Sequence, residues 1–312
     1  MTVVDITPVG FQHEAFPYTG SDDFVARAAP IVSSAVKAGQ PVLVAVDDAK
    51  IELLRDRLGS TASSVAWKDI RGIGGNPGRI IPLWRAFVAA HDRGHRLLGF
   101  GEPIWPGRDA AELVEAHRHE QLLNLAFAGV SHFTLLCPYD TERLAPAVIH
   151  ESRRSHPFVA ADGAERPSPD YCGLAAIAAA GGPALPEPAG DVREFAVGGA
   201  WSEALGAHAA GLALDAGLAP VRADNLAIAV GAVVEAMGRP GAGLAARMWR
   251  ESGAVLAEID GLGPVDDPLA GREWPAPTGG PARGLWLANQ LCDLVQVRPS
   301  GEGAVVRLRA GR

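Results

Sequence analysis

Short apolar runs alternate with longer amphipathic stretches over the first half of the chain. The runs PVLVAV and HFTLLC are apolar and rich in β-branched residues, as expected of strands that are buried on both faces of a parallel sheet. The strands predicted on this basis are 41–46, 64–67, 96–100 and 132–137, and the helices are 22–38, 49–58, 82–94 and 110–128. This alternation predicts an α/β domain with a parallel sheet flanked by helices on both faces.

The order of elements changes in the last third of the chain. A strand and two helices come first, followed by a strand pair, a stretch rich in glycine and proline, a helix and a closing hairpin. The predicted ranges are 192–197, 200–216, 223–238, 245–250, 255–260, 261–284, 285–292, 294–298 and 304–309. This order is typical of an α+β sandwich.

Alanine, glycine and proline dominate the segment between these two patterns. Five prolines punctuate residues 161–190, and the only helical spacing lies near 174–180. Such a composition is typical of a linker. We therefore expect one domain at 1–172, a linker at 173–190 and a second domain at 191–312.

Charge and hydropathy exclude several classes of partner. The net charge is −8 and the isoelectric point is about 5.6, which argues against direct binding to nucleic acid or to an anionic membrane surface. No apolar run approaches the ~20 residues that a membrane span needs. The first ten residues lack the basic and apolar regions of a signal peptide. We therefore expect a cytoplasmic protein without a membrane partner.

The positions of lysine, cysteine and histidine argue against a phosphate-binding loop, a disulfide framework and a metal site. None of the three lysines follows a glycine, so the chain contains no Gly-Lys-Ser/Thr phosphate-binding loop. The three cysteines lie far apart, which argues against a disulfide framework and fits a reducing compartment. A site built from His13, His117, His119 and His156 is disfavoured because His117 and His119 face different directions on a helix. No metal site is expected.

Six sequence boxes in the first domain resemble the MEDS domain, a sensory module of bacterial and archaeal regulators. These are FQHEAFPYTGSDDF, AGQPVLVAV, NPGRI, GEPIW, LLCPYD and the later His156-Pro157, with Glu120 and Asn124 on the helix between. The resemblance covers about 11–171. It implies a core similar to RecA and KaiC without the phosphate-binding loop, and a sensing function.

Polar and aromatic side chains follow the apolar runs of this domain. Because ligands of open α/β sheets bind outside the carboxyl ends of the strands, we expect a sensory pocket there. Its predicted lining is Glu102, Trp105, Tyr139 and Asp140, joined by His13 and Glu120. The alternative is that Glu102 and Asp140 only pin loops. Cys137 ends an apolar run and is interpreted as a buried hydrophobic residue.

The segment from Asp266 to Leu308 resembles the GHKL (histidine-kinase-like) ATPase fold, in the branch of RsbW-like anti-sigma factors and serine kinases that RsbA-family regulators share. The resemblance covers about 192–309. It implies ATP as ligand, with an acidic residue on the adenine and glycine-rich loops over the phosphates. The matching residues are Asp260, Gly263, Gly279, Gly280, Arg283 and Gly284. Asp260 lies one position before the family's aspartate, so a bulge would be needed to point it at the adenine.

The helix that carries the magnesium ligands in this family departs from the pattern. Ala232 and Ala236 take the places of its Glu and Asn, and Glu235 lies on the next turn. Alanine offers no ligand atom, so a Mg²⁺ clamp is not expected and ATP binding stays an open alternative. Restoring Glu and Asn at both positions should then increase the affinity for Mg-ATP.

Two functions follow from these resemblances. In the first, the chain senses a small molecule or a protein state and binds a sigma factor or an STAS-type anti-sigma antagonist without nucleotide turnover. In the second, it is an active ATP-dependent serine kinase. The loss of both polar positions in the magnesium helix favours the first, because phosphoryl transfer depends on metal ions. An unrelated enzyme in the first domain is disfavoured because no nucleophile–base pair is recognisable. The oligomeric state, including a homodimer, stays open, as do the signal and the partner.

Overall fold

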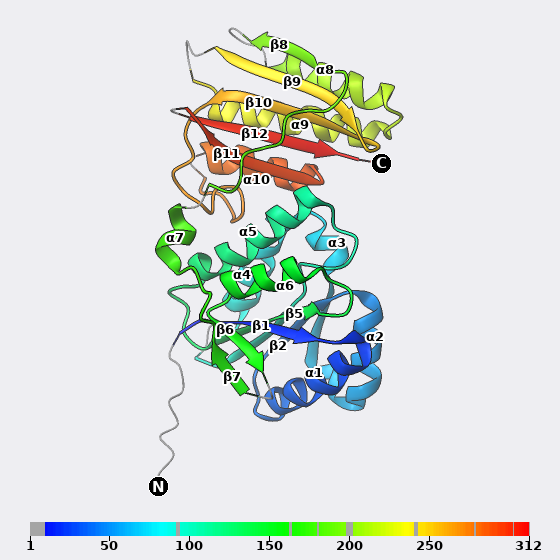
Figure 1. The fold of residues 1–312 in the computed structure, drawn as a ribbon, viewed down its shortest axis with the longest axis vertical. Coiled ribbons are helices and arrows are strands. Elements are labelled where there is room, and N and C mark those ends of the chain that lie inside the picture. The colour runs from blue at the N-terminus through cyan, green and yellow to red at the C-terminus, as the bar shows by residue number, and fades with distance from the viewer. Residues whose placement is uncertain are drawn as a thin grey trace. The chain divides into compact units, whose positions relative to one another are not determined.

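The computed structural model describes residues 10–91, 94–161, 164–179, 181–197, 202–239, 243–277, 279–301 and 303–311. The chain divides into two compact units (Figure 1), one of residues 1–74 and 83–179 and the other of residues 75–82 and 180–312. No helix in the described part of the chain combines the length and the apolar character that crossing a bilayer requires.

The first unit is built on a seven-stranded sheet with the order β3-β2-β4-β5-β1-β6-β7. All neighbouring strands run parallel except β6 and β7, which are antiparallel. The strands are β1 (Gln12–Tyr18), β2 (Val42–Val46), β3 (Val65–Asp69), β4 (Leu97–Gly101), β5 (Phe133–Asp140), β6 (Phe158–Ala161) and β7 (Ala164–Pro167). The parallel sheet expected from the sequence is therefore present, with an antiparallel strand added at one edge.

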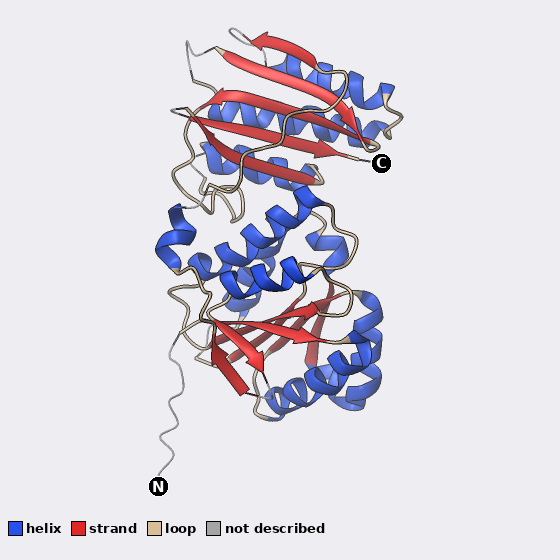
Figure 2. Cartoon of the chain, in the orientation of Figure 1, coloured by secondary structure: helices blue, strands red, loops and turns tan. Residues whose placement is uncertain are grey.

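Helices cover both faces of this sheet (Figure 2). Helices α1 and α2 lie on one face, and α4, α5 and α6 lie on the other (Figure 1). The helices of this unit are α1 (Gly20–Lys37), α2 (Asp48–Leu58), α3 (Ile70–Gly74), α4 (Ile80–Ala90), α5 (Ala110–Ala126), α6 (Pro146–Ser155) and α7 (Leu174–Ala179). Asp109 caps α5 through a capping box with Glu112, which fixes the start of the helix that carries Glu120.

The two faces of the central strands are packed differently. On the α1–α2 face, Phe16, Phe24 and Phe100 form part of an aromatic and aliphatic core. On the opposite face the Trp84 ring lies directly on β4. A Cβ at Gly99 would come within 2.8 Å of this ring and one at Gly101 within 2.7 Å, so both positions require glycine. The continuous burial of β2 and β4 explains why their sequences are apolar throughout.

The second unit is a two-layer α/β sandwich. Its antiparallel sheet has the order β11-β12-β10-β9-β8, and α8, α9 and α10 cover one face (Figure 1). The elements are β8 (Arg193–Val197), α8 (Ser202–Asp215), α9 (Pro220–Met237), β9 (Leu244–Glu251), β10 (Ala254–Leu262), α10 (Pro281–Leu291), β11 (Leu294–Ser300) and β12 (Gly303–Ala310). The α/β and α+β classes expected from the sequence are both confirmed.

Residues 75–82, which include the first three residues of α4, are counted with this second unit. Within it, Asn76 Nδ2 and Arg79 Nε donate hydrogen bonds to the backbone oxygen of Asn289, at 3.2 and 2.6 Å. Arg79 Nη2 donates to the backbone oxygen of Cys292 at 2.8 Å. These donors satisfy carbonyl groups at the C-terminal end of α10 that have no partner within the helix.

The segment interpreted as a linker is divided between the two units. Residues up to 179, including α7, go with the first unit, and residues from 180 onward go with the second. In the second unit, Arg298 Nε donates to the Pro183 oxygen and Arg307 Nη2 to the Pro186 oxygen, both at 2.7 Å. Residues 183–186 are therefore tied to β11 and β12, although their proline-rich composition is typical of a free linker.

Candidate functional site

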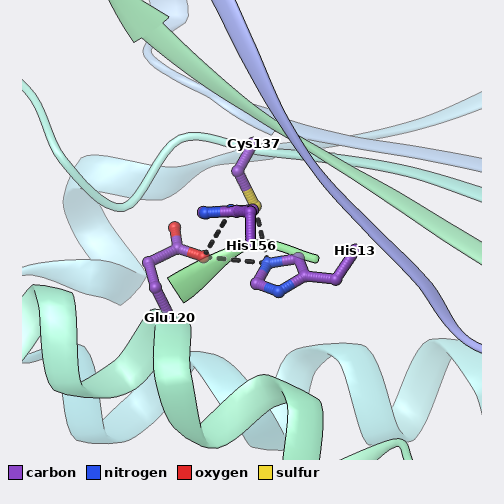
Figure 3. Close-up of side chains that lie close together, drawn as sticks. All are labelled: His13, Glu120, Cys137 and His156. Carbon is purple, nitrogen blue, oxygen red and sulfur yellow. Dashed lines mark hydrogen bonds and ion pairs between the residues drawn. The ribbon is translucent and has the colours of Figure 1, made fainter. Parts of the chain in front are cut away.

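Four buried side chains converge on one face of the sheet in the first unit (Figure 3). His13 belongs to β1, Cys137 to β5 and Glu120 to α5, and His156 directly follows α6. All four have no exposed surface. One ligand atom from each lies within 4.8 Å of the others. We refer to these four residues as the His–Glu–Cys cluster.

The strand pairing explains why residues from distant parts of the chain meet here. Strands β1 and β5 are parallel neighbours, with Ala15 opposite Cys137. His13 precedes Ala15 by two residues, and side chains two apart in a strand share a face, so His13 and Cys137 point to the same side. Glu120 and Asn124 are four residues apart on α5 and share the helix face that covers this side of the sheet.

Two atoms, Nε2 of His13 and Oε2 of Glu120, make the close contacts of the His–Glu–Cys cluster. Nε2 of His13 lies 3.0 Å from Oε2 of Glu120 and 3.3 Å from Sγ of Cys137. Nε2 of His156 lies 3.2 Å from the same Glu120 oxygen. The two imidazole rings are 4.0 Å apart between centroids. Two nitrogens, one oxygen and one sulfur therefore surround a common point.

Hydrogen bonds behind the rings fix which nitrogen of each histidine carries the proton. Asn124 Nδ2 donates to the backbone oxygens of Glu120, Gln121 and Ser155, so its Oδ1 must accept from Nδ1 of His13, 3.2 Å away. Nδ1 of His156 lies 2.7 Å from the Ser152 oxygen, which can only accept. In the neutral rings, both Nε2 atoms therefore point a lone pair toward Glu120. Nε2 of His156 has no well-aligned hydrogen bond among the described residues.

Burial dominates the electrostatics of this cluster. Loss of solvent, together with the nearby His156, lowers the pKa of His13 to about 4. Burial and then the negative charge of Glu120 raise the pKa of the Cys137 thiol well above its usual value. Burial alone would raise the pKa of Glu120, but the charge of a protonated His156 and the N–H groups that protonated His156 and His13 would turn toward the carboxylate hold it well below its usual value. The cluster therefore contains a carboxylate, a neutral His13 and a protonated thiol in a site without solvent.

A second polar group lies at the carboxyl ends of β1, β2 and β4. Glu102 follows β4 and is 1% exposed. It accepts hydrogen bonds from Tyr18 Oη at 2.7 Å and from Lys50 Nζ at 2.9 Å. Lys50 also donates to Asp47 at 2.6 Å, and Asp47 caps α2. All these polar atoms are used within the group, which supports the alternative that Glu102 has a structural role.

The six residues predicted to line one sensory pocket lie in different surroundings. His13 and Glu120 meet in the His–Glu–Cys cluster, and the Tyr139 ring packs edge-on against His156 at 5.7 Å. Tyr139 and Asp140 are adjacent in β5 and therefore point to opposite faces. Asp140 Oδ1 accepts from the backbone nitrogens of Glu142 and Gly20, which pins two turns. A single pocket lined by all six stays a prediction.

Trp105, the remaining residue of this prediction, packs against arginines. The Arg108 guanidinium lies 3.6 Å from the centre of its ring, and that of Arg71 lies 5.3 Å away. Arg108 is itself buried and donates to the Pro103 and Gly74 oxygens. These contacts hold the loop after β4 in place.

The residues matched to nucleotide binding lie at the ends of β10 and α10. Asp260 Oδ1 accepts from the backbone nitrogen of Gly261 at 2.8 Å, and the pairing of β10 with β12 shifts register between Ile259 and Leu262. The strand pairing is therefore irregular beside Asp260, but its carboxylate already accepts a hydrogen bond from the backbone of the next residue. Gly263 donates its backbone N–H to the Met237 oxygen at 2.7 Å.

The glycine-rich segment is shorter than its sequence indicates. Gly279 and Gly280 both have a φ of +83° and precede α10. The helix begins at Pro281, four residues earlier than predicted, because proline is favourable in the first turn of a helix. Gly284 therefore lies inside α10 and is buried, and Arg283 is exposed on the same helix. Gly284 is not part of a loop, contrary to the sequence-based expectation.

Helix α9 contacts α10 at Ala232 and Ala236, the two positions where the sequence lacks the Glu and Asn of the resembled family. A Cβ added to Gly284 would lie 2.6 Å from the Ala232 oxygen and 2.6 Å from the Ala236 Cβ. Real side-chain atoms do not approach this closely. The small residues at 232, 236 and 284 thus permit close packing of the two helices.

Comparison with known proteins finds a match in the N-terminal half of the chain. No curated protein matches the chain. Residues 12–157 match the family model MEDS, described as "MEthanogen/methylotroph, DcmR Sensory domain". This part of the chain is therefore similar to a sensory domain, as its sequence boxes indicated, and the similarity points to a sensor role in signalling.

Proposed function

We propose that the chain is a regulator in which the sensory unit controls a sigma factor or an STAS-type anti-sigma antagonist held by the second unit. The observation that carries the sensing half is the match of residues 12–157 to a sensory family. The two-layer sandwich of the second unit supports the other half, since the proposed ATPase-like fold has this architecture. The signal is a small molecule or a protein state.

The contact between α9 and α10 favours binding without turnover. An ATPase of the proposed kind needs a carboxylate and an amide on α9 to orient water and hold Mg²⁺. Ala232 and Ala236 supply neither, and their closeness to Gly284 leaves little space for an ion beside them. Partner binding does not depend on these groups, because recognition uses the surface of the fold.

The competing function is an ATP-dependent serine kinase acting on the same partner. The register shift beside Asp260 and the positive φ of Gly279 and Gly280 are the features that favour it. Both are compatible with a nucleotide near the start of α10. The missing magnesium ligands weigh against it, so ATP binding in this proposal is weak and independent of Mg²⁺.

Partner binding is tested with the purified full chain and two candidates, an alternative sigma factor and an STAS-domain protein from the same genome. We expect one of them to form a stable complex in nucleotide-free buffer, measured by calorimetry and light scattering. The housekeeping sigma factor is the control and should not bind. If neither candidate binds, or if binding requires Mg-ATP, the proposal fails.

A further inference from the structure

The His–Glu–Cys cluster brings together four side chains that each offer a ligand atom for a metal ion. Its atoms are the Nε2 of His13, the Nε2 of His156, a Glu120 carboxylate oxygen and the Cys137 sulfur. Imidazole, carboxylate and thiolate are the ligands of Zn²⁺ and similar ions. All four residues are fully buried, so water cannot satisfy these atoms.

The spacing of these atoms is close to that of a four-coordinate site. Bond lengths of about 2.0–2.3 Å at a tetrahedral ion place neighbouring ligand atoms about 3.3–3.8 Å apart. Three of the separations here are 3.0, 3.2 and 3.3 Å, and every ligand atom lies within 4.8 Å of the others. Small rotations that move the closest ligand atoms apart and bring the more distant ones together would complete the geometry.

The hydrogen bonds behind the ligands are those expected of a metal site. Metal-bound histidines donate their second N–H to a carbonyl or carboxylate, which orients the ring. Here Asn124 Oδ1 and the Ser152 carbonyl fulfil this role for His13 and His156. Both Nε2 lone pairs therefore face the Glu120 oxygen, acceptor against acceptor. A proton between them would satisfy one pair, whereas a metal ion would satisfy all four groups.

We propose that the His–Glu–Cys cluster binds one divalent transition-metal ion, with Zn²⁺ the best match to its ligands. The four protein ligands leave no open position, as in structural sites. Binding forms the Cys137 thiolate and releases its proton to solvent. The ion joins β1, β5, α5 and the residue after α6, so it stabilises the sensory unit. This inference does not rest on the proposed partner or on the second unit.

Metal binding is tested on the full chain by elemental analysis after growth with zinc, and by Co²⁺ addition after chelation. We expect one ion per chain and, with Co²⁺, the absorption of a tetrahedral site with a thiolate band. Cys137→Ser should remove the thiolate band, and His156→Asn should weaken the affinity at least about tenfold. Zn²⁺ should also raise the melting temperature of the parent chain.

Matched controls are available for both ligands. Cys172→Ser changes a thiol outside the cluster, and His150→Asn changes an exposed histidine on α6; neither should alter binding. Glu120→Gln serves as a third variant if another fails to fold. No bound ion in either assay would overturn the proposal. So would a thiolate band that survives Cys137→Ser or disappears with Cys172→Ser. A negative result here would leave partner binding untouched.

Discussion

Replacement of Lys50 by methionine should destabilise the first unit by about 3–5 kcal/mol, because it leaves a buried carboxylate without its cation. Lys50 Nζ lies 2.9 Å from Glu102 Oε2, and the two side chains are 8% and 2% exposed. Among the described residues, the other side chain that donates to Glu102 is Tyr18, through its hydroxyl. Urea unfolding followed by circular dichroism measures the change.

The pH dependence of this variant follows from the same group. Burial already raises the pKa of Glu102 in the folded protein, and loss of Lys50 removes the main interaction that opposes it. A carboxyl whose folded pKa is raised binds more protons when folded, so the stability deficit should shrink as the pH falls below that pKa.

Lys50→Met with Glu102→Gln should recover part of the loss. Lys37→Met, at an exposed lysine in the last turn of α1, is the control and should change little. A Lys50→Met protein with the same free energy of unfolding as the parent would refute the structural role assigned to the ion pair of Lys50 and Glu102.

Replacement of Gly284 by alanine should destabilise the second unit by about 1–3 kcal/mol, because the added methyl group overfills a closed helix contact. The new Cβ would lie 2.6 Å from the Ala232 oxygen, so the backbone of α9 or α10 must move. Thermal unfolding of the full chain measures this loss in the transition that belongs to the second unit.

Gly211→Ala is the matched control for this substitution. Gly211 is also a helical glycine of the second unit, on α8, and a Cβ there meets nothing within 4 Å. The free energy of unfolding of the Gly211→Ala protein should rise by about 0.5–1 kcal/mol, because alanine leaves the unfolded chain fewer conformations than glycine does. Equal effects at both glycines would show that α9 and α10 are not closely packed. The same packing argues against the expectation that Glu and Asn at 232 and 236 would restore Mg-ATP binding, because Ala236 already lies against Gly284.

The regular elements could be predicted from sequence because their burial patterns are strong. The run that forms β2 is apolar throughout, β5 is apolar over most of its length, and the glycines after α1 and α2 mark helix ends. Strand β1 was not assigned from its pattern, because QHEAFPY mixes charged residues with a proline. Its buried charges are explained only by the groups that surround it in the fold.

The candidate site could be predicted only in part, because His13 lies more than a hundred residues before the other three members in the chain. His13 and Glu120 were identified through the resemblance, but Cys137 was interpreted as a hydrophobic residue. The missing information was that β1 and β5 are neighbours, which depends on the order of crossovers rather than on local pattern. Given that pairing, the alternation along β5 would have placed Cys137 beside His13. Lys50 was likewise missed, because a charged residue in a helix is normally exposed.

Calorimetric titration of the full chain with ATP, in the presence and absence of Mg²⁺, tests the central claim that this regulator binds its partner without turnover. The account predicts weak or undetectable heat that Mg²⁺ does not change, no release of phosphate, and no transfer of phosphate to an STAS-domain protein. Mg²⁺-dependent ATP binding with hydrolysis, or phosphorylation of that protein, would contradict it and establish the kinase instead.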